Sequence, residues 1–193
     1  MTLGKSAVDF ARICVDAEVR GRMADIPDPA LSSEMRGVFV TLNKYPSGDL
    51  RGCIGFPYPI MPLTDAIRGS AESACHDPRF PDLGEDELDL ITVEVTLLSV
   101  PEELMFDDPR DLPGMIVIGR DGLIMECMGH RGLLLPQVPV EWGWDATEYL
   151  RHFSMKAGLP SDAWMHPDTR IWAFEGEVFS EDSPRGNVSE RKI

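Results

Sequence analysis

The sequence has no long apolar run. No stretch approaches the roughly 20 consecutive apolar residues that a helix needs to cross a bilayer. The first residues, Met1 to Ser6, also lack the apolar core of a signal peptide. These two absences argue against a membrane-spanning protein and against a secreted one. We therefore expect a cytoplasmic protein that does not act on membranes.

Cysteine is scarce, and its four positions are scattered. Cys14, Cys53, Cys75 and Cys127 form no C-x-x-C pair, which argues against a disulfide framework and against a cysteine-rich zinc site. The C-x-x-H spacing from Cys127 to His130 has the form of half a metal site, but a turn after a strand explains it more simply. We therefore expect no metal and no cofactor.

Positive charge is scarce as well. The chain has 18 Lys and Arg against 33 Asp and Glu, a net charge of −15, and no run of basic residues. Affinity for nucleic acids comes largely from Lys and Arg that neutralise phosphates, so this balance argues against DNA or RNA as a partner. The length of 193 residues and the 43% hydrophobic content are typical of a folded soluble domain.

What the sequence does contain is a set of helix and strand patterns. Apolar spacing predicts helices over 6–24 and 63–76, and a third from a capping box at Asp145 to a glycine at 158. Alternation predicts strands over 37–43, 50–55, 91–97 and 169–179, the first two joined as a hairpin.

Three further segments complete the organisation. A second hairpin is expected from 115–118 and 123–126, joined through an Asp-Gly step. Two prolines indicate irregular backbone within 133–141, and 181–193 is expected to be a polar tail. Hairpins interspersed with separate helices favour an α+β fold, with a mainly antiparallel sheet flanked by helices, and we treat 1–193 as one domain.

One stretch, Leu50-Arg51-Gly52-Cys53-Ile54-Gly55, combines a strand pattern with two glycines. Residues two apart share a face of a strand, so Arg51, Cys53 and Gly55 are expected opposite Leu50 and Ile54. Glycine within a strand often marks a place where another group approaches the backbone closely. The plainer alternative is a hairpin strand with glycines placed for twist and a small buried cysteine.

Other polar residues lie where a site could form. Arg79 lies in the stiff loop Asp77-Pro78-Arg79-Phe80-Pro81, which is a good mount for a guanidinium. Glu94 faces away from the core of its predicted strand, either to solvent or into a cleft. Gln137 and Glu141 fall on the expected irregular backbone, and Lys156 is in the last turn of a helix, where it suits the helix dipole.

Four of these stretches together resemble the signatures of the AMMECR1 family. They are Leu50 to Gly55, Asp77-Pro78-Arg79-Phe80, Leu134-Leu135-Pro136-Gln137-Val138 and Lys156-Ala157-Gly158-Leu159-Pro160, in matching order and spacing. The resemblance covers nearly the whole chain. It implies an α+β protein with a larger lobe, a smaller lobe and a cleft between them near the hexapeptide, although the sequence does not place the lobe boundary.

The resemblance implies a fold more than an activity, because the biochemical activity of the family is not established. Members are often encoded with, or fused to, Memo-like and radical-SAM-like proteins, which are therefore possible partners. This chain has no cysteine triad for an iron–sulfur cluster, so it would be the partner and not the radical enzyme.

Three functional hypotheses remain open. The first is an enzyme with Cys53 as nucleophile, Arg51 lowering its pKa, and Glu94, Glu141 or His130 as the proton-transfer group. A second is a module that binds a small anionic ligand or a segment of a partner. Its binding residues would be Arg51, Gly52, Gly55, Arg79, Gln137 and Lys156. The third is a non-catalytic scaffold for a Memo-like protein.

Overall fold

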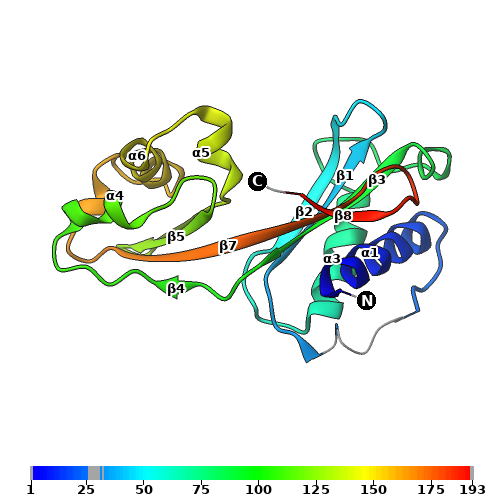
Figure 1. Cartoon of the computed structure of the whole chain (residues 1–193), viewed down its shortest axis with the longest axis horizontal. Coiled ribbons are helices and arrows are strands. Elements are labelled where there is room, and N and C mark those ends of the chain that lie inside the picture. Colours follow the sequence, from blue (N-terminus) through cyan, green and yellow to red (C-terminus); the bar gives the residue numbers. More distant parts are fainter. Residues whose placement is uncertain (1, 26–30, 32, 192–193) are drawn as a thin grey trace. The chain divides into compact units, whose positions relative to one another are not determined.

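The computed structural model describes residues 2–25, 31 and 33–191 of the chain (Figure 1). The chain divides into two compact units. Unit 1 contains the described residues up to Val100 together with those from Glu177 onward, and unit 2 is Pro101–Gly176. One long strand, β7 (Arg170–Glu181), supplies residues to both units.

The sheet of unit 1 is built around an antiparallel hairpin. β1 (Val38–Lys44) pairs with β2 (Leu50–Phe56) on one side and with β3 (Ile91–Leu98) on the other. The strand order is β2-β1-β3-β7, and β8 (Val188–Arg191) is antiparallel to the end of β7. The predicted hairpin and the predicted strand at 91–97 are both confirmed, and β2 is left as an edge strand.

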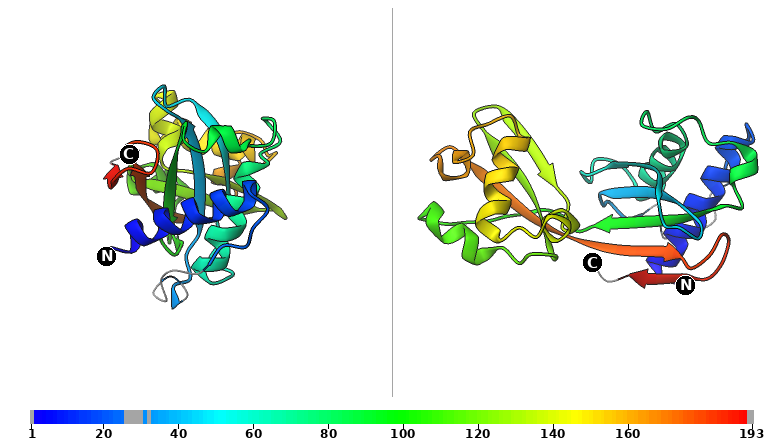
Figure 2. Two further views of the ribbon diagram at one scale, coloured as in Figure 1. Left: turned by 90° about the vertical axis from the view of Figure 1, so that its right-hand side faces the viewer. Right: turned by 90° about the horizontal axis from the view of Figure 1, so that it is seen from above.

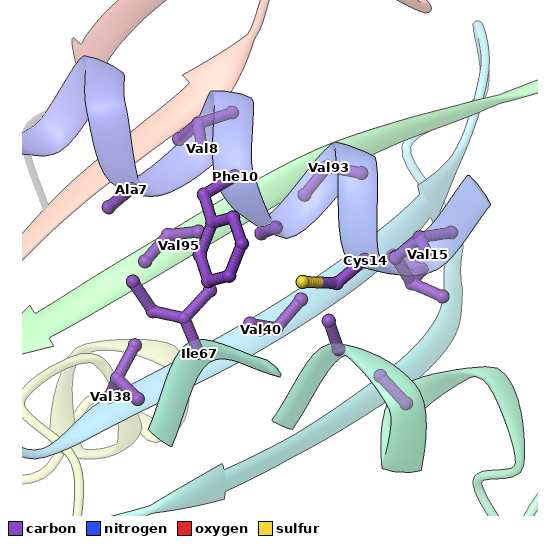
Figure 3. Close-up of a cluster of buried hydrophobic side chains, with 14 of the residues drawn as sticks. Ala7, Val8, Phe10, Cys14, Val15, Val38, Val40, Ile67, Val93 and Val95 are labelled. Atoms are coloured by element: carbon purple, nitrogen blue, oxygen red, sulfur yellow. The ribbon is translucent and has the colours of Figure 1, made fainter. Parts of the chain in front are cut away.

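Two helices of unit 1, α1 (Leu3–Val19) and α3 (Leu63–Cys75), supply the core that packs against the sheet (Figure 2). The buried valines of β1 and β3 form the floor of this core, and Phe10 of α1 and Ile67 of α3 cover them (Figure 3). The first helix was expected over 6–24. It begins earlier because Thr2 accepts a hydrogen bond from the Lys5 N–H, and it ends earlier, before Gly21 at φ +62°.

The segment expected to be a polar tail, 181–193, begins with the last residue of β7 and contains β8. Glu181 and Arg12 are only 4% and 7% exposed. They form a buried ion pair, with Arg12 Nε 2.9 Å from Glu181 Oε1, and Glu181 also accepts the Val93 N–H at 2.9 Å. A buried charge that is paired leaves no apolar pattern, so the sequence alone gives no signal that Glu181 is buried.

Unit 2 is organised by β5 (Asp121–Cys127), which lies between β6 (His130–Leu134) and β7, while β4 (Glu102–Glu103) pairs with β7. The hairpin expected from 115–118 and 123–126 does not form, although its second strand lies within β5. Residues 112–115 form α4 (Leu112–Met115), and the Asp121 carboxylate accepts the Val117 N–H at 2.8 Å, so the Asp-Gly step begins a strand. The tight turn is at Met128 and Gly129, both at positive φ, which agrees with the turn expected between Cys127 and His130.

The other helices of unit 2 are α5 (Gln137–Trp142) and α6 (Ala146–Lys156), the latter packed against β6 (Figures 1 and 2). The capping box between Asp145 and Glu148 is confirmed, with bonds of 2.8 and 3.1 Å. Irregular backbone was expected at 137–141. A short helix forms there because its one proline, Pro139, lies in the first turn, where no N–H partner is needed.

Short 3₁₀ turns complete the structure: η1 (Glu85–Glu87), η2 (Pro109–Asp111) and η3 (Ala163–Met165). The α+β fold with a mainly antiparallel sheet and flanking helices is confirmed. Within the described part of the chain, no helix has the length and apolar character needed to cross a membrane.

Candidate functional site

The hexapeptide forms β2, and a bulge at Arg51 divides its side chains between two faces. Leu42 lies opposite Gly52 and Asn43 lies opposite Leu50, which leaves Arg51 without a partner on β1. Beyond the bulge, Cys53 lies opposite Thr41, and Ile54 lies opposite a core valine of β1.

The expected alternation is therefore half right. Cys53 and Ile54 do face opposite sides of the sheet, but Leu50 follows Asn43 away from the core and is exposed. Arg51 does not share a face with Cys53, because the bulge turns it toward the loop that follows α3. Two residues expected to act together are thereby separated.

The Arg51 guanidinium is already occupied within the chain. Arg51 is only 5% exposed. Its Nε lies 2.8 Å from Glu87 Oε1, and its Nη2 lies 2.8 Å from Glu87 Oε2. Nη2 also donates to the Asp82 carbonyl at 3.2 Å, and the Phe80 ring centroid is 5.9 Å from Cζ. The ion pair holds the pKa of Glu87 below its usual range. Within the part of the chain that the structure describes, Arg51 therefore joins β2 to the segment that contains Asp82 and Glu87.

The two glycines of the hexapeptide are explained by close packing. A Cβ at Gly52 would lie 2.3 Å from the carbonyl oxygen of Ala74 on α3. At Gly55 it would lie 2.3 Å from the Val38 carbonyl and 2.4 Å from the Phe39 ring. The space beside each glycine is filled by the chain itself, so these sides offer no room for a ligand.

Asp77 and Arg79 cover the open edge of β2 at Cys53. The Asp77 carboxylate accepts the Cys53 N–H at 2.9 Å, and Arg79 Nη2 donates to the Cys53 carbonyl at 3.2 Å. Arg79 also donates to Asp77 through Nε and Nη2, at 3.0 and 2.6 Å. Asp77 is 1% exposed, and the Arg79 guanidinium holds its pKa well below the usual range. Both outward backbone groups of Cys53 are thus satisfied.

The Cys53 thiol lies on the face of the sheet opposite the helices, which we call the outer face and define by Cys53, Thr41 and Glu94. These three residues lie side by side on β2, β1 and β3. Burial raises the pKa of Cys53, although a hydrogen bond from the Thr41 hydroxyl at 3.3 Å and the charge of Arg79 oppose this effect. The raised pKa favours the protonated thiol at neutral pH.

Glu94 is a half-buried carboxylate on the same outer face. Burial raises its pKa, and the charge of Arg191 on β8 only partly opposes the shift. Neither a hydrogen bond nor an ion pair joins the Glu94 side chain to another residue in the described ranges. A carboxylate in this state could exchange protons or receive a donor from a ligand.

The remaining predicted site residues lie in unit 2. Gln137 begins α5, and its side-chain oxygen is buried without a hydrogen-bond partner among the described residues. Glu141 on α5 and Lys156 at the end of α6 are exposed. His130 begins β6 and has Nδ1 3.2 Å from the Ala157 carbonyl oxygen. The structure thus brings together Cys53 and Arg79, with Glu94 on the same face as Cys53.

Three residues of this region were not singled out from the sequence. Thr41 could have been found from the hairpin, because the strand register places it opposite Cys53. Asp77 was named only as part of the loop that carries Arg79, yet the same Asp-Pro-Arg tripeptide recurs at Asp108-Pro109-Arg110 with the same local hydrogen bonds. Glu87 carried no sequence signal that would pair it with Arg51.

Comparison with known proteins agrees with the four family signatures found in the sequence. The AMMECR1 family model matches residues 8–179. The chain belongs to the AMMECR1 family. Protein MJ0810 of Methanocaldococcus jannaschii is 48% identical over 192 residues, covering 98% of this chain and 96% of that protein. A protein of Thermococcus gammatolerans is also 48% identical, over 197 residues, with the same shares covered.

A solved AMMECR1-like structure supports the fold. The crystal structure of the uncharacterized protein PH0010 from Pyrococcus horikoshii superposes with a TM-score of 0.87 at 44% identity. The match covers 98% of this chain and 97% of that one. The resemblance inferred from the four short signatures therefore holds over nearly the whole chain.

Proposed function

We propose that this AMMECR1 protein binds a small anionic ligand, or an anionic segment of a partner, at Arg79 beside Cys53, and that binding there is non-covalent. The observation that carries the proposal is the state of the Arg79 side chain, which is 55% exposed although two of its nitrogens are fixed. Among the described residues, nothing accepts a hydrogen bond from its third nitrogen, Nη1.

Such an arginine is well suited to recognition. Bonds to Asp77 and to the Cys53 carbonyl hold the guanidinium in one orientation, so little conformational entropy is lost when a ligand binds. The free Nη1 edge can donate to a carboxylate or phosphate oxygen, and charge-assisted bonds of this kind are the strong ones. Asp77 reduces the net charge of the site, which favours a ligand held by directed hydrogen bonds over a loosely held counter-ion.

The state of Cys53 argues against the nucleophilic alternative. A reactive cysteine needs a lowered pKa, and burial raises that of Cys53. Arg51 was expected to lower the pKa of Cys53, but its guanidinium is bound to Glu87, and the bulge turns it away from the face that carries Cys53. Cys53 instead places a small, polarizable side chain beside the ligand position at Arg79.

The involvement of Gln137, Glu141 and Lys156, all in unit 2, stays a prediction.

The test is an NMR titration of the ¹⁵N-labelled full chain with inorganic phosphate, acetate, citrate and a phosphoserine peptide. We expect saturable shifts of the Cys53 and Arg79 amides with at least one of these probes. Arg79→Gln should weaken that binding by about tenfold or more, since a bond to a charged group contributes about 1.5–3 kcal/mol.

Arg110→Gln is the matched control. Arg110 makes the same hydrogen bonds to Asp108 within an identical tripeptide, but it is 82% exposed and has no bond to a strand edge. It should leave binding unchanged. If no probe moves the Cys53 and Arg79 amides, or if Arg79→Gln and Arg110→Gln behave alike, the proposal is overturned.

A further inference from the structure

A second feature of the outer face lies away from Arg79, in a hollow of about 410 Å³ between the β1–β2 hairpin loop and β8. Its walls are mostly polar and belong entirely to unit 1. The lining side chains that matter here are Asn43, Tyr45, Thr92, Glu94, Asp182 and Arg191. A hollow of this size is large enough for a small metabolite and is at the lower end of the range for ligand pockets.

Two opposite charges line this hollow without contacting each other. Glu94 and Arg191 are close enough for the arginine to act on the carboxylate electrostatically, yet no ion pair joins them. In the described ranges neither side chain has another hydrogen-bond or ion-pair partner. The two other charged residues of the lining are Lys44 and Asp182. Lys44 acts electrostatically on Glu87, and Asp182 is already engaged, because it accepts the Ser189 hydroxyl at 2.6 Å.

This arrangement defines which ligand would be complementary. A half-buried carboxylate without a donor is unfavourable, and an ammonium group would supply both the donors and the charge. The guanidinium of Arg191 would in turn bind a carboxylate. A purely anionic ligand would meet Glu94 and Asp182, and a simple amine would leave Arg191 unused.

We infer that the hollow binds a small zwitterion of the amino-acid class, with its ammonium group on Glu94 and its carboxylate on Arg191. Tyr45, from the hairpin loop, forms part of the wall near which the rest of the ligand would lie. This inference goes beyond the proposed anion site, because it uses different residues of the sheet and does not depend on Arg79.

The test is an NMR titration of the ¹⁵N-labelled full chain with each of the standard L-amino acids, followed through the Gly48, Thr92 and Glu94 amides. We expect saturable shifts with at least one of them. Each hit is then compared with its decarboxylated amine and with its deaminated acid. The intact zwitterion should bind about tenfold or more tightly than either half-molecule, since each half loses one charge-assisted contact.

Variants assign the two ends of the ligand. Glu94→Gln and Arg191→Gln should each weaken binding of the zwitterion by about tenfold or more, and they should affect different half-molecules. Glu190→Gln is the matched control, because Glu190 neighbours Arg191 on β8 but lines a different pocket. Arg79→Gln should have no effect, which separates this inference from the proposed function.

Three results would overturn the inference. These are the absence of saturable shifts in the hollow with every amino acid, binding of the amine or the acid as tight as that of the zwitterion, and unchanged affinity in both charge variants. Folding of each variant is checked by the dispersion of its amide spectrum. Arg191→Gln changes an exposed side chain, so it keeps the test valid even if Glu94→Gln fails to fold.

Discussion

The Asp77 carboxylate accepts the backbone N–H of Cys53 at 2.9 Å, and this bond fixes the loop after α3 to the edge of the sheet. An edge strand normally presents unpaired backbone groups to which another chain can add. In this protein, side chains of one short loop occupy those groups at Cys53. The edge is therefore protected at the residue that the family signature surrounds.

Asp77→Asn is expected to destabilise the protein by about 2–3 kcal/mol, because the change removes the charge from a buried acceptor of several hydrogen bonds. Denaturant unfolding at neutral pH measures the effect. Asp108→Asn, in the matching tripeptide at the surface, should have a much smaller effect, because solvent screens its ion pair with Arg110. Equal costs for the two variants would contradict this role of Asp77.

The same aspartate predicts a dependence on acid. Arg79 holds the folded-state pKa of Asp77 well below its unfolded value, so the unfolded state binds more protons as the pH falls. The stability that Asp77 contributes is complete above its unfolded pKa of about 4 and is lost as the pH falls toward the folded value. Wild type and Asp77→Asn should therefore converge in stability only at strongly acidic pH, in unfolding curves recorded from neutral pH downward.

Gly52→Ala is expected to cost about 2 kcal/mol or more, because the added Cβ would overlap the Ala74 carbonyl oxygen on rigid helix backbone. Gly114→Ala is the control, since a Cβ at that position would have no atom within 4 Å from the described residues outside its own turn of chain, and its φ is not positive. It should change the free energy of unfolding by about 0.5 kcal/mol or less. A neutral Gly52→Ala would show that α3 can move away from β2.

Cysteine labelling tests the protonation state of Cys53. Cys53 is partly exposed, whereas Cys14, Cys75 and Cys127 are buried. Burial also raises the pKa values of Cys14 and Cys75 to about 12. With iodoacetamide we expect Cys53 to react before these two, but more slowly than a free reference thiol, and with its half-maximal rate shifted to higher pH. Peptide-resolved mass spectrometry across pH 6 to about 10 measures the rates. A rate above that of the free thiol near neutral pH would restore the nucleophile hypothesis.

Glu94→Gln should stabilise the ligand-free protein at neutral pH by about 1 kcal/mol or less, because it removes the cost of burying a charged carboxylate. The folded-state pKa of Glu94 is raised, so the folded state binds more protons than the unfolded one as the pH falls from neutral. The destabilisation caused by the ionised carboxylate is therefore relieved in mild acid, and the variant should lose its advantage there. Thermal unfolding at pH 7 and at pH 4 compares the two proteins.

The elements that were predicted correctly are those with strong local patterns. The β1–β2 hairpin, β3 and the capped helix α6 follow from alternation, turn residues and a capping box. The expected strand at 115–118 is wrong because a short continuous apolar run does not distinguish a strand from the end of a short helix followed by a turn. The bulge at Arg51 is a register feature set by the partner strand, so the hexapeptide alone does not encode it.

The candidate site was predicted only in part for a similar reason. Its residues could be named from the signatures, but their roles depend on contacts between distant segments. Nothing in the sequence pairs Arg51 with Glu87, or leaves Glu94 and Arg191 facing the same hollow. The bond between Asp77 and Arg79 is local, and its repetition at Asp108 and Arg110 shows that the tripeptide itself favours it.

The sharing of β7 between the two units has a consequence for biosynthesis. Unit 2 is continuous in sequence, so a ribosome delivers all of it, Pro101–Gly176, before it delivers Glu181 and β8. Until then Arg12 can bind the Leu88 and Ile91 carbonyls but lacks the Glu181 carboxylate, and the sheet of the nascent first segment lacks two strands. Unit 2 can therefore complete its core during translation, whereas unit 1, although it begins first, is completed later and exposes an unfinished sheet edge to chaperones in the meantime.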